Sequence, residues 1–346
     1  MVDRCAPAAP QHFILALPDL RLARGGVVRR HRIAAWWWSR PGDTPAEPLA
    51  DVPTVLLVHA LTGGAQAGGK DGWWEPLIGA GRVLDPAKHR IVCFNNLGSF
   101  YGSSAPGMPG WPKSKKTQLT SVDLAGAILQ GLDALGLKRV QLAAGGSLGG
   151  MVVLALAARD PKRFAAIMPI ATSAAATAWV VGWNHVARAA LRVDPGYPHH
   201  AARGLEVARQ IAMLTYRAEP GLAQKQTART IGSYLEHHGK KLHGRFTAQC
   251  YESQLDAMDH HDLSEPLPGT RGSALARIKT PALVVDVDTD QLFTPAQSEA
   301  LAAALRANGT RVEHATVRSP HGHDAFLLEW EQLAKLIRRA LALSPS

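Results

Sequence analysis

Ser147 is the centre of a Gly-x-Ser-x-Gly pattern at residues 145–149. An apolar stretch at 140–142 precedes the pattern and another at 151–158 follows it, as expected of a strand and then a helix. A sharp strand-to-helix turn exposes a serine hydroxyl, and glycine neighbours let the backbone turn tightly. The sequence therefore predicts that Ser147 is a nucleophile that attacks carbonyl carbon.

A serine hydroxyl needs a base, and the base needs a carboxylate that orients it. In this arrangement the acid and then the histidine follow later strands of the chain. Asp290 comes after the apolar strand Ala282–Val287, in the loop. His321 and His323 both follow the next strand, Val312–Val317, and spacing alone leaves open which of them is the base. Two other candidates lie inside these strands: Asp286 and His314.

Two backbone N–H groups must stabilise the negative charge that develops on the attacked carbonyl oxygen. The residue after the nucleophile, Leu148, is expected to supply one of them. The second is expected from the loop at residues 59–63, which follows an apolar strand at 54–59. Leu61 is the predicted donor in that loop.

The elements that must position these residues alternate between strand and helix, which is typical of an α/β fold with a mostly parallel sheet covered by helices. A helix is expected at 121–135 with Ser121 as its cap and Gly136 just beyond its end. The other expected strands are at 90–94, 139–144 and 164–170, and the other helices are at 148–159, 295–308 and 325–343.

Residues 175–273 show helical patterns without a convincing strand, so we expect a helical lid inserted into the sheet domain. The expected division is a core at 1–174, a lid at 175–273 and the rest of the core at 274–346. Seven of the fifteen histidines lie between His199 and His261. No acidic or cysteine residue has the spacing of a metal ligand set near them, so we expect solvated lid residues and no metal.

Composition excludes several classes of protein. With 46% hydrophobic and 19% charged residues, the 346-residue chain suits a globular core rather than a disordered chain.

The net charge of +10 attracts polyanions, but the densest basic runs, 29–32 and 113–116, accompany no nucleic-acid motif. No apolar window reaches the length of a membrane span. Three unpatterned cysteines and the lack of a signal-peptide run at the start favour a cytoplasmic location.

Further motifs lie along about residues 50 to 330. They are His59-Ala60-Leu61-Thr62-Gly63, Gly72-Trp73-Trp74, Leu77-Ile78-Gly79, Asn96-Leu97-Gly98, Tyr101-Gly102-Ser103, and residues 145–151, 209–217, 290–295 and 322–327. Together these segments resemble the homoserine O-acetyltransferase family. The tryptophan and Ala-Leu-Thr elements among them are not shared by a general hydrolase.

The resemblance implies an α/β-hydrolase fold and a homodimer that associates through the lid. It implies the triad Ser147, Asp290 and His323, and so selects between the two histidines. It also implies that Arg209 holds an amino acid's carboxylate and Asp324 its ammonium group, and that two further residues line the site: Tyr216 and Thr62. Arg209 and Tyr216 are seven residues apart on an expected helix, so they share a face.

The activity expected from this resemblance is transfer of an acetyl group from acetyl-CoA to L-homoserine by a ping-pong mechanism, without a bound cofactor. Leu148, Gly64 and Phe100 depart from the residues usual in the family, which leaves the donor and acceptor open. Succinyl-CoA as donor and L-serine as acceptor are the nearest alternatives. An esterase or thioesterase, and a non-catalytic binding protein, are the alternatives from other classes.

Overall fold

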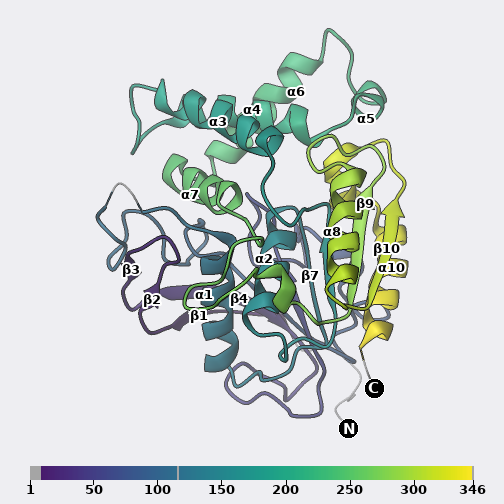
Figure 1. Cartoon of the computed structure of the whole chain (residues 1–346). Helices are drawn as coiled ribbons and strands as arrows, with labels where there is room; N and C mark the ends of the chain where they lie inside the picture. Colours follow the sequence, from purple (N-terminus) through teal and green to yellow (C-terminus); the bar gives the residue numbers. More distant parts are fainter. Residues whose placement is uncertain (1–8, 115–116, 345–346) are drawn as a thin grey trace.

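An eight-stranded sheet forms the centre of the protein in the computed structural model, which describes residues 9–114 and 117–344 (Figure 1). The first two strands in spatial order are antiparallel to their neighbours, and the strands from β6 to β10 run parallel. This confirms the predicted mostly parallel α/β fold. In spatial order the strands are β1 (Gln11–Ala16), β4 (Arg32–Trp38), β6 (Arg90–Phe94), β5 (Thr54–Val58), β7 (Leu142–Gly146), β8 (Ile167–Ile170), β9 (Ala282–Val287) and β10 (Val312–Val317). A separate short pair joins β2 (Leu20–Arg21) and β3 (Val27–Val28).

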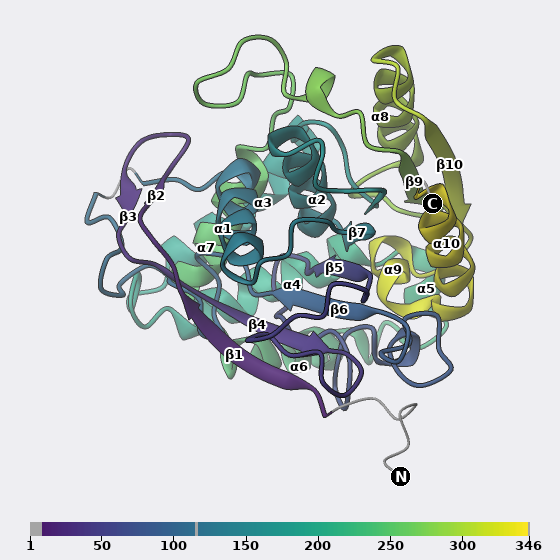
Figure 2. The ribbon, with the colours of Figure 1, turned by 90° about the horizontal axis from the view of Figure 1, so that it is seen from below.

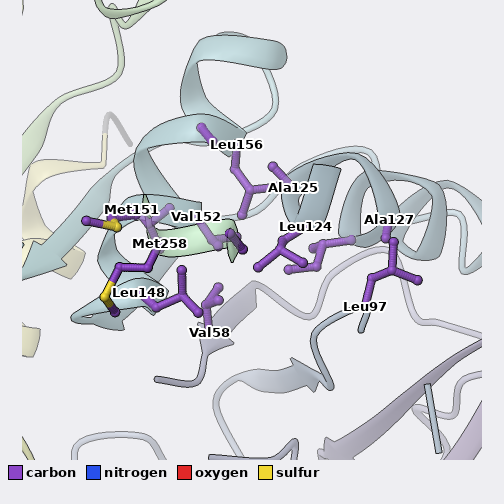
Figure 3. Close-up of a cluster of buried hydrophobic side chains, with 14 of the residues drawn as sticks. Val58, Leu97, Leu124, Ala125, Ala127, Leu148, Met151, Val152, Leu156 and Met258 are labelled. Atoms are coloured by element: carbon purple, nitrogen blue, oxygen red, sulfur yellow. The ribbon is translucent and has the colours of Figure 1, made fainter. Parts of the chain in front are cut away.

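Helices cover both faces of the sheet. Figure 2 shows α1 (Ser121–Ala134), α2 (Leu148–Arg159) and α8 (Pro295–Ala307) on one side and α10 (Trp330–Leu343) on the other. Strands β5 and β7 are buried along their whole length, which explains why their sequences are almost continuously apolar. In the close-up of Figure 3, Leu124 of α1, Val152 of α2 and Val58 of β5 belong to one buried cluster.

Five helices stand between β8 and β9 and lie above the sheet in Figure 1. Met258 of the last helix packs into the cluster of Figure 3, so this helical region is anchored on the core. The lid boundaries expected at 175 and 273 remain a prediction. The helices are α3 (Ala178–Arg192), α4 (Ala202–Tyr216), α5 (Glu219–Ala223), α6 (Ile231–His243) and α7 (Ala248–Asp259).

Two expectations about helix ends were wrong. The cap of α1 is Thr120 rather than Ser121, because Thr120 and Asp123 exchange side-chain and backbone hydrogen bonds in a capping box. The single helix expected at 325–343 is broken at Glu329, whose ψ of 59° is not helical, into α9 (Ala325–Leu328) and α10. Strand β7 begins three residues later than the expected start at 139, since Val140 forms only an isolated bridge with Phe164.

His261 corrects the expectation that the lid histidines are solvated. It is 1% exposed, and its ring bonds the hydroxyl of Ser121 at 2.6 Å and the carbonyl of Ser173 at 3.0 Å. Burial lowers the pKa of His261 to about 4, so it is a neutral link between lid and core.

Within the described residues, no helix is long and apolar enough to cross a membrane. Cys93 and Cys250 are buried free thiols. The third cysteine, Cys5, lies outside the described residues, as do Lys115 and Lys116 of the basic run at 113–116.

Candidate active site

The turn that carries Ser147 joins β7 to α2. Ser147 has φ +58°, in the left-handed region that side chains seldom adopt, and its N–H donates to the carbonyl of Ile170 at 2.9 Å. A Cβ on Gly149 would lie 2.3 Å from the backbone oxygen of Val58, so α2 can approach β5 only with glycine there. The sequence pattern therefore reflects both a strained backbone at Ser147 and close packing of α2 against β5 at Gly149.

Gly149→Ala is expected to destabilise the protein by roughly 1–3 kcal/mol, because a backbone oxygen cannot move aside as a flexible side chain can. Gly182→Ala is the matched control, since Gly182 is exposed in α3 and a Cβ there has no neighbour within 4 Å. That control is expected to gain up to about 1 kcal/mol from helix propensity. Urea unfolding measures both, and equal midpoints would contradict the packing argument.

His323 and Asp290 form a buried pair. His323 Nδ1 donates to Oδ2 of Asp290 at 2.6 Å, and each residue is 3% exposed. The other carboxylate oxygen of Asp290 accepts the N–H groups of Leu292 at 2.8 Å and Phe293 at 2.9 Å. Nε2 of His323 has no hydrogen-bond partner among the described residues, and His323 lines the same cavity as Ser147.

The structure places the other acid and histidine candidates away from this pair. His321 packs against Gly221 of α5. His314 of β10 pairs with Asp286 of β9 at 2.6 Å within the sheet. The histidine that pairs with Asp290 is therefore His323.

The environment of His323 favours its charged form. Burial lowers the pKa of this imidazole, but the charge and hydrogen bond of Asp290, together with the charge of Asp324, outweigh burial. The pKa of His323 is thus raised above its ordinary value of 6.5. Such a pair can take a proton from a nearby hydroxyl and hold it while the carboxylate stabilises the cation.

The two expected oxyanion donors lie beside this machinery. Leu148 is the first residue of α2, so its N–H has no acceptor within the helix. Leu61 lines the cavity in the loop after β5. In that loop, Gly63 N–H donates to the carbonyl of Ala60 at 3.0 Å, and His59 Nδ1 bonds the same carbonyl at 2.8 Å.

The sequence did not predict that the His59 side chain holds the loop after β5 through its hydrogen bonds. Its Nε2 accepts the N–H of Asn96 at 2.9 Å, so the opposite nitrogen carries the proton and donates to Ala60. Burial lowers the pKa of His59 to about 4, which keeps the ring neutral and its hydrogen bonds in this direction. Its position at the end of the apolar strand β5 was a signal that could have identified it.

The cavity has a volume of about 790 Å³ and is lined by all four residues that the resemblance assigned to substrate. Arg209 Nη1 lies 3.5 Å from the hydroxyl of Thr62, and its guanidinium carbon lies 5.6 Å from the Tyr216 ring. The Tyr216 ring is 5.7 Å from that of His323. Asp324 lines the cavity beside His323, but it also pairs with Arg217 at 3.1 Å.

Lid residues that no motif indicated also line the cavity. Lys241 of α6 and Arg245, just after α6, add positive charge near Arg209. Burial and then the charges of Arg209 and its neighbours lower the pKa of His238 to about 4. This side of the cavity is therefore cationic, a property suited to anionic groups.

A parallel sheet with a serine on the turn after β7, an acid after β9 and a histidine after β10 defines the α/β-hydrolase class. The family model described as "alpha/beta hydrolase fold" matches residues 53–329. Many curated relatives carry the name homoserine O-acetyltransferase, and two of them illustrate the similarity. That of Thermus thermophilus is 39% identical over 82% of this chain and 80% of its own length. That of Trichormus variabilis is 36% identical over 96% of this chain and 95% of its own.

A solved structure gives the same relationship. The homoserine O-acetyltransferase of Staphylococcus aureus superposes with a TM-score of 0.81 at 27% identity, covering 96% of this chain and 95% of that one. This chain belongs to the homoserine O-acetyltransferase family.

Proposed function

We propose that this protein transfers an acetyl group from acetyl-CoA to the side-chain hydroxyl of L-homoserine through an acyl-Ser147 intermediate. One observation carries the proposal: the cavity that contains Ser147 and His323 also contains a guanidinium, Arg209, and a carboxylate, Asp324. These two groups complement the carboxylate and ammonium of a free amino acid. Membership of the family supports the same acceptor and donor.

In the first half-reaction His323 Nε2 takes the proton of the Ser147 hydroxyl while the oxygen attacks the thioester carbonyl. The N–H groups of Leu148 and Leu61 stabilise the oxyanion. The tetrahedral intermediate then collapses, the carbon–sulfur bond breaks, and His323 returns its proton to the departing CoA thiolate. The products are acetyl-Ser147 and free CoA thiol.

In the second half-reaction homoserine enters with its carboxylate against Arg209, which can bind it bidentately, and with its ammonium against Asp324. Arg217 shares the Asp324 carboxylate and holds it at the cavity wall. His323 removes the hydroxyl proton of homoserine while the homoserine oxygen attacks the acetyl carbon. The bond between the acetyl group and the Ser147 oxygen then breaks, and His323 returns the proton to that oxygen. The lid helices α4 and α6 cover the site, which favours transfer over hydrolysis by water.

Thiol release tests this function. We expect free thiol to form from acetyl-CoA faster when homoserine is present, with one O-acetylhomoserine for each thiol. Release that homoserine does not change, with acetate as the product, would instead assign a thioesterase. Parallel reactions with succinyl-CoA and with L-serine identify the donor and acceptor, and a preference for either would replace that part of the proposal.

The pH dependence follows from the raised pKa of His323. Only the neutral imidazole can accept the Ser147 proton, so activity is lost as pH falls through this pKa. We expect kcat/KM for acetyl-CoA to rise with pH to a plateau, with a midpoint above 6.5. Steady-state rates between about pH 5 and pH 9 measure the midpoint. A midpoint below 6.5 would show that burial, rather than Asp290, dominates the titration.

The acyl donor carries phosphates, and the cationic side of the cavity would attract them. Arg209, Lys241 and Arg245 lie there, and the chain as a whole has a net charge of +10. Positive charge raises the association rate of a polyanionic substrate, and dissolved salt screens this attraction. We therefore expect KM for acetyl-CoA to increase with ionic strength. No resident cofactor is part of the proposal.

We further propose a cytoplasmic homodimer that associates through the lid. Exposed apolar side chains support it, because they recur seven residues apart on two lid helices and so form stripes. The residues are Trp179, Val186 and Val193 at α3 and Val207 and Leu214 on α4. Sedimentation velocity tests the oligomeric state: a monomer at micromolar concentration would contradict it.

A further inference from the structure

Arg245 reaches from the lid to two loops of the core. It lies between α6 and α7, half-buried, and lines the cavity. Its Nη1 donates to the carbonyl of Thr62 at 2.9 Å and to the hydroxyl of Tyr101 at 2.5 Å. A single guanidinium nitrogen thus joins the lid, the loop after β5 and the loop after β6.

The hydrogen bond to Thr62 determines the orientation of a peptide plane. The carbonyl of Thr62 and the N–H of Gly63 belong to one planar peptide group. Arg245 holds the oxygen of this plane, while the N–H points the other way and donates to the carbonyl of Ala60 at 3.0 Å. The plane is therefore held at both ends.

The peptide plane whose carbonyl accepts the Gly63 N–H contains the expected oxyanion donor. The carbonyl of Ala60 and the N–H of Leu61 share a peptide group, and in a trans peptide they point in opposite directions. Because the Ala60 carbonyl accepts from Gly63 and from His59, the direction of the Leu61 N–H is set as well. Two rigid peptide planes, joined by the hydrogen bond from Gly63 to Ala60, thus connect the Arg245 guanidinium to the Leu61 N–H.

Tyr101 holds Arg245 in place. Its backbone has φ +63°, which is unfavourable for a tyrosine, so its surroundings must hold it there. Its ring packs edge-on against Phe246, with 6.1 Å between centroids, and against Phe100 at 5.4 Å. A Cβ on Gly64 would lie 3.0 Å from this ring, so the glycine leaves the space that the phenol occupies.

From these contacts we propose that Arg245 is a positioning residue, which sets the oxyanion donor of Leu61 by holding the Thr62 carbonyl from the lid. The inference rests on the proposed function only in that Ser147 and the Leu61 N–H act in acyl transfer. Loss of Arg245 would leave the Thr62–Gly63 plane held only by its hydrogen bond to Ala60, so the plane could tilt, and this would slow attack on any acyl donor.

The test uses p-nitrophenyl acetate, whose cleavage needs Ser147 and the oxyanion donors but neither CoA nor homoserine. With the full-length protein, Arg245→Met is expected to reduce kcat on the order of 100-fold, the effect of a small misplacement at a reacting centre. Millimolar guanidinium should restore part of the rate, and KM for homoserine should stay unchanged. Tyr101→Phe removes one hydrogen bond of Arg245 and keeps the arginine itself, so kcat for p-nitrophenyl acetate should fall by a smaller factor.

Arg192→Met is the matched control, because Arg192 is a lid arginine that pairs with Glu252 at 2.7 Å and its side chain is 57% exposed. We expect it to keep the wild-type rate and to show no response to guanidinium. The proposal is overturned if Arg245→Met cleaves p-nitrophenyl acetate at the wild-type rate. It is also overturned if the variant only raises KM for acetyl-CoA, which would make Arg245 a substrate-binding group. If Arg245→Met does not fold, a wild-type rate for Tyr101→Phe overturns it.

Failure of the homoserine transferase function would leave this test intact, since ester cleavage requires no acceptor amino acid. Conversely, a wild-type ester rate in Arg245→Met would leave the transferase proposal in place.

Discussion

Ser147→Ala is expected to reduce kcat by about 10⁴- to 10⁶-fold, the scale on which loss of a triad nucleophile acts. The reason is structural: the hydroxyl is the group that would form the acyl intermediate, and among the described serines only Ser147 has a positive φ, of +58°. Alanine fits the same turn, so folding should be little changed. The rate of thiol release from acetyl-CoA measures the effect.

Ser233→Ala is the control for this prediction. Ser233 is exposed on α6, and its hydroxyl donates to the carbonyl of Thr230 at 2.9 Å, away from the cavity-lining residues. We expect that variant to keep full activity. Ser147→Ala with more than a tenth of the wild-type rate would refute the acyl-serine scheme.

Asp290→Asn is expected to reduce kcat by about 10⁴-fold while the fold is preserved. The N–H groups of Leu292 and Phe293 bond one side-chain oxygen of Asp290. In asparagine the amide oxygen must take this place, so its NH₂ group faces Nδ1 of His323. The imidazole must then accept at Nδ1 and carry its proton on Nε2, where it cannot take the proton of Ser147.

The same substitution should shift the acid limb of the pH profile downward. Without the carboxylate charge, burial is the largest remaining influence on the pKa of His323, and burial lowers it. Asp288→Asn is the control: Asp288 is exposed and accepts the N–H of Ser319 at 2.9 Å, outside the cavity. An Asp290→Asn variant with an unchanged profile would contradict the account of this pair.

The sequence was sufficient to place Ser147 and Asp290 because each follows an apolar run long enough to be recognised as a strand. It was not sufficient to choose between His321 and His323. These residues are two positions apart around a single turn of 3₁₀ helix, Gly322–Asp324, in which Gly322 has φ +65°. The ring that meets Asp290 is decided by that backbone, and only the family resemblance selected it.

The edge of the sheet formed by β1 was not predicted, although the opposite edge, β10, was. In β1, half-buried and exposed residues alternate, so the strand lacks the continuous apolar run that marks β5 and β9. It also pairs antiparallel with β4, outside the alternation of strand and helix that indicated the fold class.

Arg245 could not be found from the sequence for a different reason. Its hydrogen-bond partner Thr62 is 183 positions away, and no local pattern marks a side chain whose role depends on a distant loop. His261 is similar, since it bonds Ser121 across 140 positions and looked like one of several lid histidines. The residues that join the lid to the core bond partners that are far away in the sequence. The spacing of residues along the chain therefore does not predict these contacts.

The intact mass of the protein after mixing with acetyl-CoA alone tests the central claim most directly. We predict the added mass of one acetyl group, on the peptide that contains Ser147, and faster loss of that group to homoserine than to buffer, with O-acetylhomoserine as the product. A protein that never acquires the acetyl group, or one that homoserine discharges no faster than water does, would contradict the account.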